Sequence, residues 1–288
     1  MKAIRKTALA ATGLVLALGL TACGGGDGKA SGSGSGNSSS KGGERKAVDD
    51  SADKALKAAD PVTALKAAAV KGAQQNTYRT KGKRKTKDGE FTSEGVFQVK
   101  PHAADMKDFG ARTEDTPDGV NHIISVNGVM YGNTVAVPGK KWWSFELGKD
   151  KEKEVSEPFV RMSAALSTTR DVKNTGVETV GGRRAAHFQG TVVVSELSAY
   201  KGDAMKETDR DFYAKDLKTE GLEQIRLDVW VDKDGLVLKT EESGRSNKGE
   251  YRTSEEYSGF GEPVSVQAPP AADTAGLKES MEALAKKK

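Results

Sequence analysis

The chain has 288 residues, of which 30% are charged, with a formal net charge of +4 at pH 7 and a single cysteine, Cys23. Three of the positive charges lie at the N-terminus, so the remainder of the chain carries only about +1. Nucleic-acid binding through the folded part requires a concentrated basic surface, and this balance argues against it. One cysteine also excludes an internal disulfide, so an exported form must be stabilised by its core.

The N-terminal segment has the pattern of a secretory signal. Lys2, Arg5 and Lys6 precede an apolar run from Ala8 to Leu20, and this order of a basic start and a short apolar stretch is typical of such signals. The run has 13 residues, whereas a helix that spans a bilayer needs about 20. We therefore predict that residues 1–22 direct export and are then removed.

The sequence Leu20-Thr21-Ala22-Cys23 closes the apolar run and resembles the lipobox of bacterial lipoproteins. The resemblance implies that the Cys23 thiol receives a diacylglycerol and that signal peptidase II cleaves between Ala22 and Cys23. A buried free cysteine is the alternative, but a thiol next to a Gly/Ser tract has no core to enter. The expected location is the extracytoplasmic face of the cell membrane, with acyl chains as the anchor.

The amino-acid composition after Cys23 changes along the chain and indicates a linker, a folded domain and a tail. Residues 24–48 are rich in Gly and Ser and almost lack apolar side chains, so burial cannot offset the entropy of ordering them. We predict a lipidated cysteine and flexible linker over 23–49, one folded domain over 50–270 and a C-terminal tail over 271–288. A flexible linker of this length holds the domain roughly 25–30 Å from the membrane on average.

Three helices are predicted in the folded domain. Asp60 is a typical N-cap, Pro61 suits the first turn and Gly72 suits the end, which indicates a helix over 61–72. A second helix is expected from Pro158, because Phe159, Met162 and Leu166 recur at the spacing of one helical stripe. A third is expected around residues 212–217.

Between these helices the apolar pattern has period two, which predicts strands. The expected strands are 91–99, 122–126, 129–132, 141–147, 171–180, 186–194, 225–231, 236–238 and 251–257, with a short edge piece at 263–268. Asn127-Gly128, Gly181-Gly182 and Asp234-Gly235 are expected to form tight turns between strands. The result is an α+β protein with a mostly antiparallel sheet.

This order of elements resembles the LolA-like lipoprotein fold, which includes lipid-carrying lipoproteins of the LppX and LprG type. The resemblance lies in the hairpin Asp228 to Leu236, the strand His187 to Thr191 and the closing segment Phe260 to Val264. It implies a curved half-barrel sheet with helices across its concave face and an apolar ligand between them. The ligand-binding residues would then be Leu65, Phe159, Met162 and Leu166; alternatively, these residues pack a closed core.

No catalytic residue, metal site or cofactor is predicted. His102, His122 and His187 lack the spacing that places two metal ligands on one helix face, and no G-x-S-x-G motif is present. Asp232-x-Asp234-Gly235 matches only part of a calcium loop and is better explained as a turn. Gly181 to Arg184 lies between strands, so we interpret it as a solvated turn and not as a phosphate site.

The C-terminal tail has Leu277, Met281 and Leu284 at helical spacing before Lys286 to Lys288. It is either a short amphipathic helix whose lysines contact anionic lipid or a frayed, solvated end. The expected partners are the membrane, through the lipid anchor, and a lipid or other apolar ligand, with the protein a monomer. The alternative function is a tethered interaction or sensor module with a filled core.

Overall fold

The structure is a computed structural model that describes residues 51–86, 89–113, 116–134, 137–147 and 155–286. The signal segment, Ala22, Cys23 and the linker lie outside the described residues, so their predicted roles remain predictions. No helix within the described ranges is both long and apolar enough to cross a membrane.

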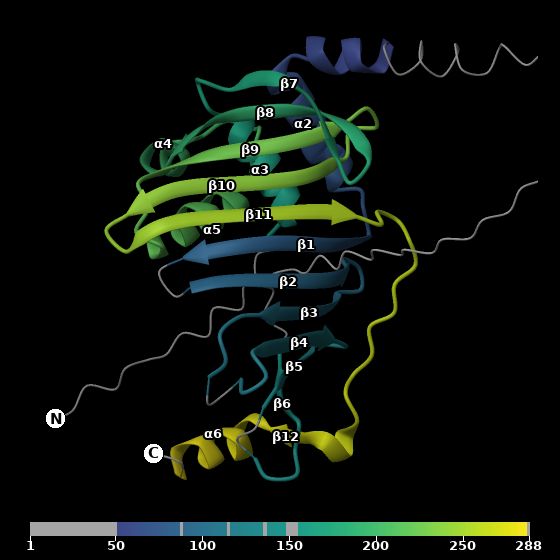
Figure 1. Ribbon diagram of the computed structural model, residues 1–288, viewed down its shortest axis with the longest axis vertical. Helices are drawn as coiled ribbons and strands as arrows, with labels where there is room; N and C mark the ends of the chain where they lie inside the picture. The colour runs from purple at the N-terminus through teal and green to yellow at the C-terminus, as the bar shows by residue number, and fades with distance from the viewer. Residues whose placement is uncertain (1–50, 87–88, 114–115, 135–136, 148–154, 287–288) are drawn as a thin grey trace, which may run out of the picture.

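One curved, open sheet of twelve strands organises the described part of the chain (Figure 1). Its spatial order is β12-β6-β5-β4-β3-β2-β1-β11-β10-β9-β8-β7, antiparallel throughout except for the parallel pair β6 and β12. The strands are β1 (Thr77–Thr86), β2 (Gly89–Gln98), β3 (Ala103–Phe109), β4 (Val120–Val126), β5 (Val129–Asn133), β6 (Trp142–Glu146), β7 (Lys173–Val180), β8 (Arg183–Val193), β9 (Gln224–Asp232), β10 (Val237–Ser246), β11 (Gly249–Ser258) and β12 (Thr274–Gly276).

The helices cover only part of this sheet. They are α2 (Pro61–Gly72), α3 (Pro158–Ser167), α4 (Val194–Ala199), α5 (Glu207–Thr219) and α6 (Leu277–Lys286), with a helical turn before α2 at residues 51–58 and a 3-10 turn at Ala271–Asp273. Helices α2 to α5 lie behind β7 to β11 in Figure 1, whereas α6 lies at the opposite end of the molecule against β6 and β12. We call the sheet face on which α2 to α5 pack the inner face, and its reverse the outer face.

The main core lies between α2 to α5 and the inner face. Apolar residues of the strands alternate inward, as with Ile225, Leu227, Val229 and Val231 of β9, which are all buried. Helix α2 begins where the sequence predicts, because the Asp60 carboxylate accepts a hydrogen bond of 2.9 Å from the Thr63 amide. The helices are therefore fixed to the sheet by burial of their apolar faces.

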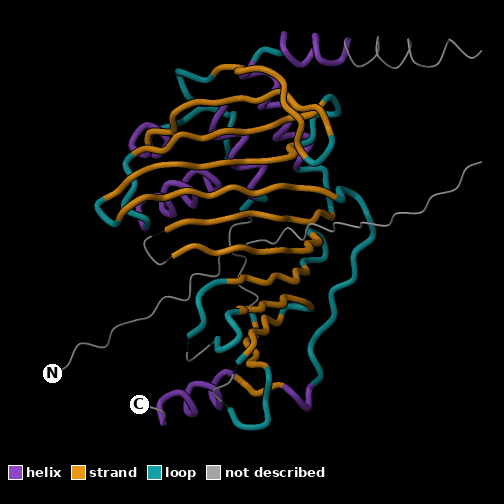
Figure 2. The backbone as a smooth tube through the Cα atoms, viewed as in Figure 1, coloured by secondary structure: helices purple, strands orange, loops and turns teal. Residues whose placement is uncertain are grey.

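The segment between β11 and β12 passes along the other half of the sheet as an irregular strap (Figure 2). Near its start, the Glu262 carbonyl accepts a 2.7 Å hydrogen bond from the Thr77 hydroxyl. Further on, Val266 packs on a small outer-face cluster that includes Ile124 and Trp142. The short edge strand predicted at 263–268 is wrong, since these residues form no strand ladder.

The predicted α+β half-barrel class is confirmed by this topology. The three predicted tight turns are present: Asn127, Gly128, Gly181, Gly182 and Gly235 all have positive φ. Of the two alternatives for residues after 276, the helix is observed, as α6. Strand β8 ends at Val193, one residue before the end predicted from its alternation, because α4 begins at Val194.

Candidate functional site

The predicted ligand-binding residues lie in the densest part of the main core. Leu65, Phe159 and Leu166 have no exposed surface, and half-buried Met162 packs against the same cluster. The Phe159 ring meets the rings of Tyr78 and Tyr257 edge-on at 5.1 and 5.0 Å. Side chains therefore fill the space between α3 and the sheet at this point, and the ligand role of the four residues stays a prediction.

Two carboxyl groups beside this cluster, buried Glu242 and half-buried Glu255, are held by hydroxyl groups. Glu242 of β10 accepts hydrogen bonds from the hydroxyls of Tyr213, Tyr251 and Thr253, the last two at 3.0 Å. Glu255 of β11 accepts one of 2.9 Å from the Tyr257 hydroxyl. Burial raises the pKa of both carboxyl groups, that of Glu255 to about 7, although the hydroxyl donors oppose the change. Burial therefore disfavours the charged form of both groups on the inner face.

The inner face continues beyond the helices as two apolar rows. Strand register aligns Phe97, Ala104, Ser125, Met130 and Phe145 across β2 to β6. The next row contains Met106, Ile123, Gly132 and Trp143, and the Trp143 ring lies so close over Gly132 that a Cβ there would approach it to 2.3 Å. Phe97, Met106, Met130 and Trp143 are only partly buried.

These rows adjoin the main core directly. Phe97 stacks on Tyr78 with ring centroids 4.7 Å apart, and Tyr78 in turn contacts Phe159. The inner face therefore presents apolar side chains from the packed core to the β6 edge, while α2 and α3 pack over β8, β9 and β10. This surface has no local signal in the sequence, because β3 lacks a clear strand pattern and because the rows combine residues from five strands.

Across the middle of the sheet, from β10 to β3, the outer face is polar and carries a row of alternating charge. Register aligns Lys239, Glu256, Lys81, Glu94 and Lys107 on the consecutive strands β10, β11, β1, β2 and β3. Opposite charges directly across a strand pair stabilise a sheet modestly. This row therefore explains why a basic strand such as β1 occupies the middle of the sheet.

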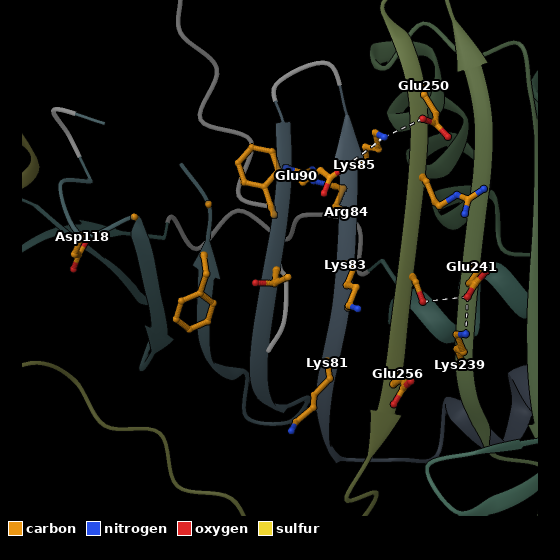
Figure 3. Close-up of a pocket in the computed structure, with 18 residues that line it drawn as sticks. Lys81, Lys83, Arg84, Lys85, Glu90, Asp118, Lys239, Glu241, Glu250 and Glu256 are labelled. Atoms are coloured by element: carbon orange, nitrogen blue, oxygen red, sulfur yellow. Dashed lines mark hydrogen bonds and ion pairs between the residues drawn. The ribbon is translucent and has the colours of Figure 1, made fainter. Parts of the chain in front are cut away.

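A hollow of about 970 Å³ lies over this polar face. Figure 3 shows Lys81, Lys83 and Lys85 of β1 beside Glu250 and Glu256 of β11 on its floor. Lys85 pairs with Glu90 and Glu250 at 3.4 and 3.2 Å. The cations and carboxylates of the hollow largely offset one another, so its charge does not select a strongly anionic or cationic ligand.

His187 forms the centre of a second polar cluster on the outer face. Its Nδ1 lies 3.0 Å from Glu178 Oε1 and its Nε2 lies 2.7 Å from Asp228 Oδ1. The ring stacks on Trp230 at 4.2 Å. Burial raises the pKa of the Asp228 carboxyl, but hydrogen bonds from His187, Arg226 and Gln189 outweigh burial and lower that pKa to about 2. We interpret this cluster as a structural ion network.

Two further sequence candidates are resolved by the structure. Asp232 Oδ1 accepts 2.9 Å hydrogen bonds from the amides of Asp234 and Leu236, so the calcium-like fragment is a turn. His122 is bonded to Asp105 at 2.7 Å, far in the fold from His187. Within the described residues, no three His, Cys, Asp or Glu side chains converge as a metal site.

Comparison with known proteins gives partial matches. No family model matches the chain. An uncharacterized 31.2 kDa protein of Streptomyces griseus is 34% identical over 117 residues, which cover 41% of this chain and 38% of that protein. A candidate lipoprotein of Streptomyces coelicolor is 33% identical over 114 residues, which cover 40% of this chain and 30% of that protein. The matched region thus spans less than half of either relative.

Among solved structures, the chain is similar to LprF from Mycobacterium bovis, with a TM-score of 0.48 and 10% identity over 73% of this chain and 97% of LprF. It is also similar to the Mycobacterium tuberculosis lipoprotein LppX, with a TM-score of 0.43 and 16% identity over 75% of this chain and all of LppX. The fold itself rests on the strand order and helix positions described above.

Proposed function

We propose that the protein is a cell-envelope lipoprotein, anchored through Cys23 to the extracytoplasmic face of the cell membrane. The observation that carries the proposal is Leu20-Thr21-Ala22-Cys23, placed between an export-type apolar run and a Gly/Ser tract. The partial similarity to a candidate lipoprotein of Streptomyces coelicolor agrees with it. The proposed organisation is a signal over 1–22, a linker over 23–49, a domain over 50–270 and a terminal segment over 271–288.

The proposed anchor is tested by replacing Cys23 with Ala and separating membrane from soluble fractions of the producing cells. We expect the wild-type chain in the membrane fraction with the added mass of acyl chains, and the variant without that mass. Retention of acyl mass by the variant would refute lipidation at this residue. A Ser40→Ala variant, with its change inside the linker, is a suitable control for processing.

We further propose that the domain binds an apolar, acyl-type ligand on the inner face. The support is the partly buried apolar surface of β2 to β6, with Met106, Met130 and Trp143, next to the packed core. Such a surface suits an acyl chain because burial of each methylene contributes about 0.8 kcal/mol, and methionine side chains adapt to varied shapes. Leu65, Phe159, Met162 and Leu166 would contact the ligand only where helix α3 moves away from the sheet.

Native mass spectrometry of the protein purified from its own envelope tests ligand binding. An adduct of lipid mass that Met106→Glu reduces, while the outer-face variant Thr92→Glu does not, supports the proposal. A bare protein mass from the same envelope would refute it.

The second candidate function is a tethered interaction or sensor module. The specific observation in its favour is that Leu65, Phe159 and Leu166 are completely buried, whereas the 970 Å³ hollow lies on the polar outer face. Crosslinking from Lys83, on the floor of the hollow, would identify a protein partner. A specific crosslinked partner, with no lipid adduct in native spectra, would favour this function over ligand binding.

A further inference from the structure

The end of the sheet formed by β6 and α6 concentrates exposed apolar side chains. Among the described residues, six large apolar side chains are exposed by more than a third, and four of them lie here: Phe145 (42%), Leu147 (39%), Leu277 (38%) and Met281 (61%). We call these four residues the β6–α6 patch. The other two of these six described residues, Val70 and Phe212, lie on α2 and α5. Such a concentration of apolar surface is typical of a contact site.

Backbone geometry makes the patch continuous. The parallel register pairs Ala275 with Trp143 and Gly276 with Ser144, and α6 begins directly after this ladder at Leu277 and contacts β6. Met281 lies one helical turn after Leu277. Leu147 follows Phe145 by two residues, and its amide donates a 2.8 Å hydrogen bond to the Gly128 carbonyl in the β4–β5 turn.

The patch is also connected to the inner face. Phe145 is the register partner of Met130, and this pair ends the apolar row that begins at Phe97. An apolar molecule that enters at the patch would therefore reach the proposed ligand surface without crossing a polar strand face. Exchange of an acyl chain with a bilayer requires an unbroken apolar path from the patch to the inner face, whereas docking of a protein partner does not.

We propose that the β6–α6 patch docks on the surface of a phospholipid bilayer and is the entrance through which the apolar ligand reaches the inner face. This inference rests on the proposed function. The sequence from Leu277 onward has a small basic excess that agrees with a bilayer, with Lys278, Lys286, Lys287 and Lys288 against Glu279 and Glu282. Lys278 is highly exposed and pairs with Glu282 at 4.0 Å. Lysines at the end of an amphipathic helix favour an anionic lipid surface.

The linker is long enough to allow docking on the membrane that holds the anchor. The described chain starts at the β7 end, where Asp53 pairs with Arg184 and the Leu56 carbonyl accepts from Asn174, whereas α6 lies at the β12 end. Eleven strand spacings of about 4.8 Å put these edges of the curved sheet at most roughly 53 Å apart. The 27 residues from 23 to 49 reach at most about 90 Å, so the domain can lie with α6 on the bilayer.

The test uses the mature chain, residues 23–288, with Cys23→Ser to remove the anchor. Co-sedimentation with vesicles of phosphatidylcholine and phosphatidylglycerol measures docking directly. We expect Leu277→Glu with Met281→Glu to lower the partition coefficient at least about tenfold, because two apolar contacts are replaced by anions. Val70→Glu, which alters the most exposed apolar side chain outside the patch (63%), is the matched control and should change it less than about twofold.

Three outcomes would overturn the docking inference. These are equal binding of the double variant and its parent, equal loss in Val70→Glu, and no vesicle binding by the parent. A parent that is dimeric by light scattering and becomes monomeric in the double variant would instead make the patch a self-association surface. Ligand binding is judged separately by the native mass spectra, so docking without a lipid adduct refutes the proposed function and not the docking site.

Discussion

Replacing Phe159 with Ala tests whether α3 seals a packed core or lines an open ligand space. The Phe159 side chain has no exposed surface, and its ring meets Tyr78, Tyr257 and Phe260 edge-on at 5.1, 5.0 and 5.4 Å. Neighbouring α2 approaches so closely that a Cβ on Gly72 would lie 2.9 Å from the ring. Nothing in this arrangement can collapse easily into the volume that the ring leaves.

The magnitude follows from these contacts. Removal of a buried phenyl ring costs about 3–5 kcal/mol through lost transfer energy and the remaining cavity, and each edge-on ring pair contributes about 0.5–1.5 kcal/mol. We expect a loss of about 4 kcal/mol in the free energy of unfolding. Met162→Ala is the control on the same helix, and because Met162 is only half-buried we expect about 1–2 kcal/mol.

Equilibrium unfolding in urea, followed by far-ultraviolet circular dichroism, measures both losses. The slope of free energy against urea should stay constant, so that the midpoints report stability alone. A loss below about 1.5 kcal/mol for Phe159→Ala, or equal losses for the two variants, would refute the packed-core assignment. Such a result would instead favour Phe159 as a ligand contact.

Two further predictions concern the buried carboxyl groups. Burial raises the pKa of Glu255 to about 7, so the folded state binds its proton more tightly than the unfolded state does. The free energy of unfolding should therefore fall as pH rises from about 4.5 through 7. Glu255→Gln should reduce the matching fall in melting temperature over this pH range. Asp228 has its pKa lowered to about 2, so its contribution is present above about pH 4 and lost as pH falls toward 2. Asp228→Asn should cost about 1–3 kcal/mol at neutral pH by leaving Arg226 and His187 without their carboxylate, as measured by urea unfolding.

Elements with local sequence signals were predictable. Helix α2 carries its cap, its proline and its glycine in the sequence, and the β4–β5 turn is encoded by Asn127-Gly128. Strand β1 was not predicted, because Lys81, Lys83 and Lys85 alternate with Gly82 and Arg84 in place of apolar residues. Pairing with glutamates on the adjacent β2 and on β11, which is distant in the chain, makes this strand favourable.

The candidate site also combines features that the local sequence predicts with features that depend on strand pairing. The helical stripe of Phe159, Met162 and Leu166 was visible as a pattern, but whether it faces a ligand or a packed core depends on the strands opposite. The inner rows and the β6–α6 patch depend on register between β5, β6 and β12. Three-residue β12 has no strand pattern of its own, so no local reading could have placed α6 against β6.

The pairing of β1 with β11 has a consequence for how the chain folds. Arg79 lies opposite Ser258. Strand β1, which joins the two halves of the sheet, therefore cannot pair with β11 until nearly the whole chain has been synthesised. Synthesis proceeds from the N-terminus, and contacts of such sequence separation are slow to form. The six strands β1 to β6 therefore remain without their central neighbour until β11 is available, which keeps the chain open for most of its production.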